Sequence, residues 1–240
     1  MKKLLFFFLL LWIEVNLFPQ KSKVWDYPIG PGSTEWTESN TVTQRLSFYN
    51  IPEDLLRVMN TGDLVRTCLN YPEWRMIFTR NSLAQGYDFI RNQFNGFREL
   101  ALRKDASLFL LEHYSKINHD DVKNIPDPVN QGVFMESILQ VEILLSQEQI
   151  IRNMSEAEQN TLKGLALRSI ENEMRLEKYF GTFPREIPSL ILARLLQIKS
   201  ETNQDLKSLL DEKMLIFIKR SAMMDSSVWF RIYELSKNSQ

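Results

Sequence analysis

The residues best suited to acid–base chemistry in this sequence are glutamates that stand among apolar neighbours. Glu136 and Glu142 lie in a stretch that we expect to form one helix, residues 128–146, and Glu173 lies in the next. Two carboxyl groups facing one cleft can hydrolyse a glycosidic bond, one as acid and the other as base or nucleophile. The chain has 30 acidic residues, and we expect most of them on solvated helix faces. A glycan hydrolase that uses a carboxylate pair is therefore the alternative function.

Histidine and cysteine are scarce, which limits metal and nucleophile chemistry. The chain contains two histidines, His113 and His119, and one cysteine, Cys68. Two aspartates follow His119, but three adjacent residues of a helix cannot all point at one ion, so we expect a solvated loop or helix cap there. His113 is expected to be partly buried and hydrogen-bonded. Cys68 lies on an expected apolar helix face, where thiols are usually inert. We predict no metal and no cofactor.

Other functional signals are absent from the sequence. The glycine-rich phosphate-binding patterns and the G-x-S-x-G nucleophile elbow do not occur. Arg91, Arg98, Arg103 and Lys104 form a local basic group, but a net charge of −1 over 240 residues argues against a nucleic-acid partner. These absences favour a non-enzymatic protein.

Five aromatic residues are the candidates for ligand contact: Trp25, Tyr27, Trp36, Tyr71 and Trp74. The first three stand in a segment that also holds two prolines and two glycines, which favours an extended backbone. They could form a platform for a sugar or protein ligand, or they could fix this segment to the helical body. The sequence favours the second interpretation for these three, because large aromatic side chains usually add buried area where they pack.

The N-terminus has the pattern of a secretory signal peptide. Lys2 and Lys3 precede ten apolar residues, 4–13, and more polar residues follow. The apolar run is about half the roughly 20 residues that a membrane-spanning helix needs. We therefore expect export to the periplasm or beyond, with cleavage between Phe18 and Lys23 and no integral membrane domain afterwards. An uncleaved apolar N-terminus is the alternative. No cysteine follows the apolar run, so we expect no lipid anchor.

Beyond position 50 the apolar residues recur at helical spacing and no strand pattern appears. Asp127 and Pro128 are typical of a helix start, Ser155 and Glu158 of a capping box, and Gly181 of a helix end. A later stretch that is apolar nearly all round predicts a helix in the middle of the core. We predict an all-α protein with about nine short-to-medium helices in an irregular bundle or helical-repeat-like array, preceded by an extended N-terminal arm.

The same signals divide the chain into segments. The boundary is expected at the Pro-rich and Asp-rich stretch in the middle of the chain. Whether the two helical halves share one core is left open by the sequence. The predicted segments are a signal peptide (1–20), an extended aromatic arm (21–50), an N-terminal helical part (51–117), a linker (118–130) and a C-terminal helical part (131–240).

Three stretches together resemble a known protein family: Asp26–Trp36, Ile51–Pro72 and Gln93–Ala106. Their motifs DYPI-PG-EW, IPEDLL, LNYP, FNGF and RKDA resemble the N-terminal module of uncharacterised secreted or lipid-anchored proteins of Bacteroidetes-type bacteria. The resemblance covers about residues 25–117. It implies an exported bacterial protein and brings no activity, cofactor or residue role with it. The missing cysteine after the predicted signal departs from the lipid-anchored members.

Taken together, the residues favour an exported, non-enzymatic helical interaction module that binds a protein or a surface polymer such as a cell-surface glycan. Its contact site is expected near the five aromatic residues. The carboxylate-pair hydrolase is the alternative, and a carrier with an apolar cavity, indicated by 15 Phe and 9 Met, is the third hypothesis.

Overall fold

A computed structural model describes residues 24–181, 185–221 and 227–239. Over these ranges the chain forms fifteen α-helices and two 3-10 helices, nine of them seven residues or longer, and no strand. The all-α prediction is therefore confirmed. The predicted signal peptide lies outside the described residues. None of the described helices is both long and apolar enough to cross a membrane.

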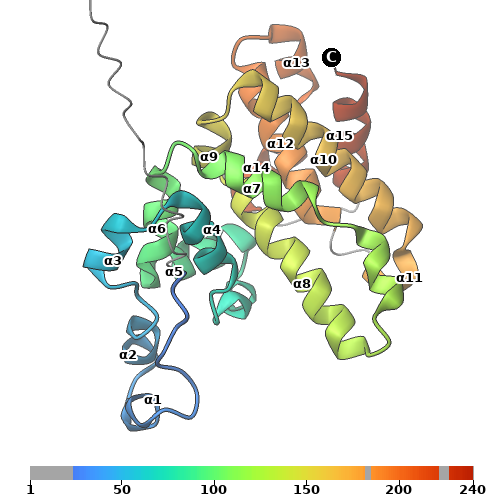
Figure 1. Ribbon diagram of the computed structural model, residues 1–240. Helices are drawn as coiled ribbons and strands as arrows, with labels where there is room; N and C mark the ends of the chain where they lie inside the picture. Colours follow the sequence, from blue (N-terminus) through green and yellow to red (C-terminus); the bar gives the residue numbers. More distant parts are fainter. Residues whose placement is uncertain (1–23, 182–184, 222–226, 240) are drawn as a thin grey trace, which may run out of the picture.

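The helices follow one another with short connections (Figure 1). In chain order they are α1 (Thr34–Glu38), α2 (Val42–Ser47), α3 (Glu53–Val58), α4 (Thr61–Leu69), η1 (Trp74–Thr79), α5 (Leu83–Gln93), α6 (Asn95–Leu102), α7 (Ala106–Ser115), η2 (His119–Asn124), α8 (Pro128–Leu145), α9 (Glu148–Arg152), α10 (Glu156–Arg175), α11 (Glu177–Phe180), α12 (Glu186–Ser200), α13 (Gln204–Leu209), α14 (Glu212–Arg220) and α15 (Ser227–Asn238).

The predicted extended arm is extended over only part of its length. Residues 24–33 have no helix, but α1 and α2 follow within the segment that the sequence assigned to the arm. Each begins at a side-chain cap, because the Ser33 hydroxyl accepts from the Trp36 amide and Thr41 from the Gln44 amide. Local capping thus makes two short helices where the prolines and glycines predicted none.

Helix starts further along the chain agree with the sequence. The Asp127 side chain accepts from the backbone of Asn130 at the start of α8. Ser155 and Glu158 form a complete capping box at the start of α10. The predicted long helix toward residue 180 is interrupted at Leu176, and α11 then ends at Gly181, which has a φ of 67°.

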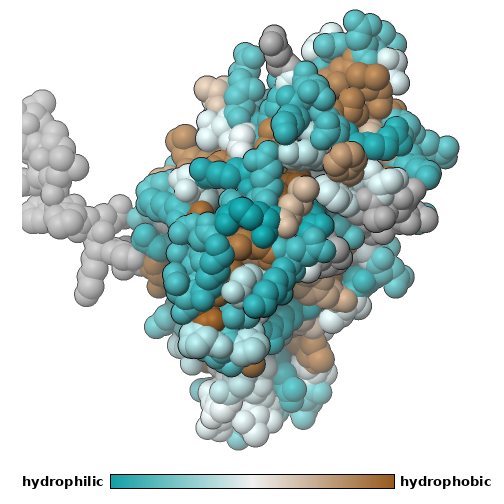
Figure 2. Space-filling view, turned by 90° about the vertical axis from the view of Figure 1, so that its right-hand side faces the viewer, coloured by the Kyte–Doolittle hydropathy of each residue, from teal (hydrophilic) through white to brown (hydrophobic). Residues whose placement is uncertain are grey.

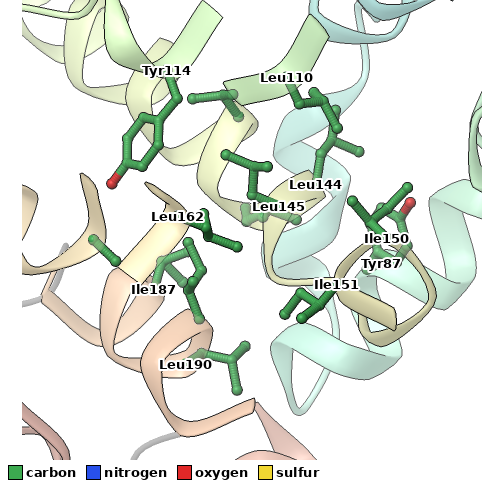
Figure 3. Close-up of a cluster of buried hydrophobic side chains, with 14 of the residues drawn as sticks. Tyr87, Leu110, Tyr114, Leu144, Leu145, Ile150, Ile151, Leu162, Ile187 and Leu190 are labelled. Atoms are coloured by element: carbon green, nitrogen blue, oxygen red, sulfur yellow. The ribbon is translucent and has the colours of Figure 1, made fainter. Parts of the chain in front are cut away.

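One main hydrophobic core joins the two predicted halves. It contains side chains from Leu46 to Tyr233, on both sides of residues 118–130. In Figure 1, α7 lies between the N-terminal helices and the C-terminal ones, and Figure 3 draws buried side chains from both groups in one cluster. The predicted linker is itself folded, because η2 buries His119 and Val122. The chain therefore does not divide at this point into separately packed halves.

The helix predicted for the middle of the core is α12. Ten of its fifteen residues are buried, and it packs against α10 and α15. This prediction is confirmed, with the helix beginning at Glu186, two residues before the expected proline. One residue in its buried stretch is charged, Arg194, and its surroundings lead to the candidate site.

Candidate functional site: an arginine-lined cavity

Two of the five predicted contact residues lie in the core. Tyr71 and Trp74 are each 2% exposed. The Tyr71 ring stacks on Phe94 with centroids 4.8 Å apart, and the Trp74 indole N–H donates to the backbone oxygen of Cys68 at 2.9 Å. Neither ring reaches solvent in this conformation, so the structure gives no support to a ligand contact at Tyr71 and Trp74. Tyr71 lies between α4 and η1 and Trp74 begins η1, and neither position showed this burial in the sequence.

The other three aromatic residues are partly buried and fix the N-terminal segment to the body. The Trp25 indole N–H donates to the Tyr49 backbone oxygen at 3.1 Å, and the Tyr27 hydroxyl donates to the Thr67 backbone oxygen at 2.6 Å. The Trp36 ring lies 5.4 Å from that of Tyr49. The anchoring interpretation is confirmed for this group, because all three side chains pack against the main core.

The predicted acid–base candidates do not face one open cleft. Glu142 and Glu173 are both 0% exposed, whereas Glu136 makes an ion pair with Arg75 at 3.0 Å. A polymer cannot reach the two buried carboxyl groups in this conformation. As placed here, they do not form the open carboxylate pair of a glycosidase.

The histidine and cysteine predictions have different outcomes. His119 was expected in a solvated loop or cap, but it is 5% exposed, and its Nε2 lies 3.0 Å from the Ser169 hydroxyl. His113, expected to be partly buried, has an exposed side chain. Cys68 is fully buried, and burial raises the pKa of its thiol, which agrees with an inert cysteine. Within the described ranges, no three metal-ligating side chains come together.

The hollow with the clearest chemical character is a cavity of about 510 Å³ between the N-terminal and C-terminal helices. Its walls come from α5, α6, α9 and α12, and Tyr87 and Ala101 supply apolar surface. Small-molecule sites commonly measure roughly 300–1,000 Å³ and often lie where two structural units meet. The size and place of this cavity therefore suit a small ligand or one unit of a polymer.

Three arginines give the cavity its charge: Arg91 of α5, Arg152 of α9 and Arg194 of α12. Two of them are neutralised by carboxylates. Arg91 pairs with Asp88 at 3.0 Å, and Arg152 contacts Glu148 at 2.7 Å and Glu201 at 2.6 Å. These contacts hold two guanidinium groups at the cavity wall but leave them little free charge.

Arg194 differs from the other two because neutral groups hold it. Its guanidinium donates to the backbone oxygen of Ser146, just past the end of α8, and to the Ser221 hydroxyl at 3.0 Å. It makes no ion pair with any carboxylate among the residues that the structure describes. Burial lowers the pKa of Arg194 to about 10, with Glu148 and Asp88 opposing the shift, so the side chain stays charged at neutral pH.

This cavity was not predicted from the sequence. Its walls come from segments up to about a hundred positions apart, and no motif connects them. A single signal was available: Arg194 interrupts a helix that is otherwise apolar nearly all round. A charge in a core helix needs a partner, because a buried ion without one is costly.

The surface offers less definite chemistry. Figure 2 shows a face on which hydrophilic residues predominate and hydrophobic residues gather in small, separate groups.

Comparison of the chain with protein-family models, with curated proteins and with solved structures finds no match. The function must therefore be argued from the cavity itself.

Proposed function

We propose that this protein is a non-catalytic binding module whose ligand presents an anionic group to the arginine-lined cavity. The ligand class is a carboxylated or sulfated unit of a surface polymer, or a free anion of the same chemistry. This proposal keeps the interaction module expected from the sequence and moves its contact site from the aromatic residues to Arg194. Export remains an expectation from the N-terminal sequence.

One observation carries the proposal: Arg194 brings a guanidinium without a carboxylate partner to the cavity. A largely buried cation that only neutral oxygens hold is stabilised when an anion binds beside it. A guanidinium also presents several N–H donors in a plane, which suits carboxylate, sulfate and phosphate groups. Because the Ser146 and Ser221 contacts fix its orientation, little side-chain entropy is lost on binding.

The carboxylates around the cavity support binding in preference to hydrolysis. Glu148 is the one acidic residue among those that line it, and this carboxylate is already paired with Arg152. Glycoside hydrolysis ordinarily needs two carboxyl groups on opposite sides of the bond. A concave site of this size also fits a small group better than the flat surface of a folded protein partner.

The test is isothermal titration calorimetry of the wild-type protein with galacturonate, with the methyl ester of galacturonate and with inorganic phosphate. We expect heat from the acid and none from its neutral ester, because the charge is what Arg194 recognises. Phosphate binding as tight as that of galacturonate would indicate a free anion as ligand, whereas tighter binding of galacturonate oligomers would indicate a polymer. No binding of any anion up to millimolar concentration would overturn the proposal.

Variants locate the binding site. Arg194→Gln should weaken binding by at least about tenfold, the loss expected for one charge-assisted contact. Arg194→Lys keeps the charge but lacks the planar donors, so its affinity should lie between those of the wild type and Arg194→Gln. Arg57→Gln, on the exposed face of α3 and outside the cavity, is the matched control and should bind as the wild type does. Circular dichroism establishes that each variant is folded, and equal affinity of Arg194→Gln and wild type would exclude Arg194 as the anchor.

A further inference from the structure

Two carboxyl groups meet in the interior of the C-terminal half. Glu142 of α8 and Glu173 of α10 are both 0% exposed, and the hydroxyl of Ser169 lies between them. The Ser169 Oγ is 2.7 Å from Oε1 of Glu142 and 3.5 Å from Oε1 of Glu173. The Tyr114 hydroxyl, from α7, donates to the same Oε1 of Glu142 at 2.6 Å. One oxygen of each carboxyl group therefore faces this shared polar cluster.

The second oxygen of each carboxyl group is buried without a hydrogen-bond partner. No ion pair compensates either group in the described part of the chain. Arg185, whose charge acts on Glu173, donates to Glu177 at 3.0 Å, and its Nε is buried and unpartnered. Two ionised carboxylates in this place would carry the cost of desolvation and repel each other. The charge of Arg185 lowers the pKa of Glu173, but burial and the charge of Glu142 outweigh it.

We propose that Glu142 and Glu173 form a proton-binding site, and that α7, α8 and α10 stay packed together around it only while the pair holds at least one proton. When this proton passes to solvent water, the interior contains two adjacent negative charges. Water must then enter between the helices, or the helices must separate. A proton fits this site better than a metal ion, since the described residues offer no group of three metal-ligating side chains. The inference is independent of the proposed ligand site.

The titratable neighbours agree with this assignment. Burial raises the pKa of Glu142 to about 7, against hydrogen bonds from Tyr114 and Ser169. Burial, and then the charge of Glu142, raises the pKa of Glu173 well above its usual range. His119 supplies no positive charge at neutral pH, because burial lowers its pKa to about 4. Tyr114 from α7 and Arg185 before α12 act on the pair itself. His119 from η2 reaches it through Ser169, and the charges of Arg168, Arg175 and Asp120 act on His119.

Infrared spectroscopy of the folded protein tests the site directly, because a protonated carboxyl group has its own C=O stretching band. At pH 6.5 we expect this band in the wild type, and we expect it to disappear as the pH is raised to 9. The double variant Glu142→Gln/Glu173→Gln should lack it. Glu136→Gln, on the same helix but in an ion pair at the surface, is the matched control and should retain it. A folded wild type without the band at pH 6.5 would overturn the proposal, even if the double variant failed to fold.

Hydrogen exchange tests the second half of the proposal. At pH 8.5 the amides of α8 and α10 should exchange faster than the intrinsic pH dependence of amide exchange predicts. We expect an excess of at least about tenfold, because a shift of one pKa unit corresponds to a factor of ten in the equilibrium. Glu142→Gln should abolish this excess and Glu136→Gln should not. No excess in the wild type would show that the proton does not control helix packing. A rise in wild-type stability on adding Ca²⁺ or K⁺ that Glu142→Gln removes would show that a cation neutralises the pair, and the proton site would be wrong.

Discussion

A Cβ atom built on Gly86 of α5 would lie 1.9 Å from the backbone carbonyl oxygen of Ile77 in η1. The obstacle is backbone, so no change of side-chain rotamer can make room for it. Gly86 therefore determines how closely α5 approaches η1. The next residue, Tyr87, lines the arginine-lined cavity, and so this contact also positions one of its walls.

Gly86→Ala should destabilise the protein, because the added methyl group forces α5 away from η1. We expect a loss near the upper end of the ~1–3 kcal/mol that overpacking usually costs, measured by urea unfolding. Gly164→Ala is the matched control, since nothing lies within 4 Å of a Cβ at this position in α10. That variant should gain about 0.5–1 kcal/mol from helix propensity. Equal stability of Gly86→Ala and wild type would show that the two elements do not approach so closely.

The Asn95 side chain hydrogen-bonds to the backbone of Ile51, and removing this side chain should destabilise the protein. Its side chain accepts from the Ile51 amide at 2.9 Å and donates to the Ile51 carbonyl at 2.8 Å, both in the interior. Asn95→Ala leaves these two groups buried without partners, at about 1–3 kcal/mol each. We expect a total loss of about 2–4 kcal/mol in urea unfolding. Asn92 is exposed, so Asn92→Ala should leave the free energy of unfolding unchanged. An equally small change for Asn95→Ala would contradict the hydrogen bonds between Asn95 and Ile51.

Local signals in the sequence predicted the fold well where a few adjacent residues decide it. The capping box of Ser155 and Glu158 and the cap at Asp127 need only one turn of chain, and both occur as expected. The two helices α1 and α2 were missed because each has six residues or fewer, too short for apolar periodicity to appear. The interruption at Leu176 was missed for a related reason: its neighbours on both sides continue the helical pattern.

The candidate site could not be predicted in the same way. Arg194 and Tyr87 meet at one cavity through tertiary packing, and sequence spacing carries no record of it. Aromatic residue type did not reveal the burial of Tyr71 and Trp74, because a ring that could contact a ligand is equally able to fill a core. Glu142 was recognised as a glutamate among apolar neighbours, but its burial near Glu173 depends on how α7, α8 and α10 come together.

Protonation of His119 should make the protein less stable in acid, whereas protonation of Glu142 should make it more stable. The pKa of His119 is lowered from 6.5 to about 4 by burial and then by Arg168 and Arg175, so the unfolded chain takes up a proton first. Stability is therefore lost as the pH falls from 6.5 toward 4, by up to about 3 kcal/mol. The Glu142 contribution is fully present below pH 4.5 and is lost as the pH rises toward 7.

Because the two effects overlap in pH, the histidine has to be removed to separate them. His119→Gln removes the loss of stability that His119 causes in acid. We therefore expect the urea midpoint of this variant to rise relative to that of the wild type as the pH falls from 6.5 to 4.5. His113→Gln is the control, since solvent screens that exposed side chain and its curve should stay closer to the wild type. Parallel curves for His119→Gln and wild type would mean that His119 accepts its proton in the folded protein as readily as in the unfolded chain.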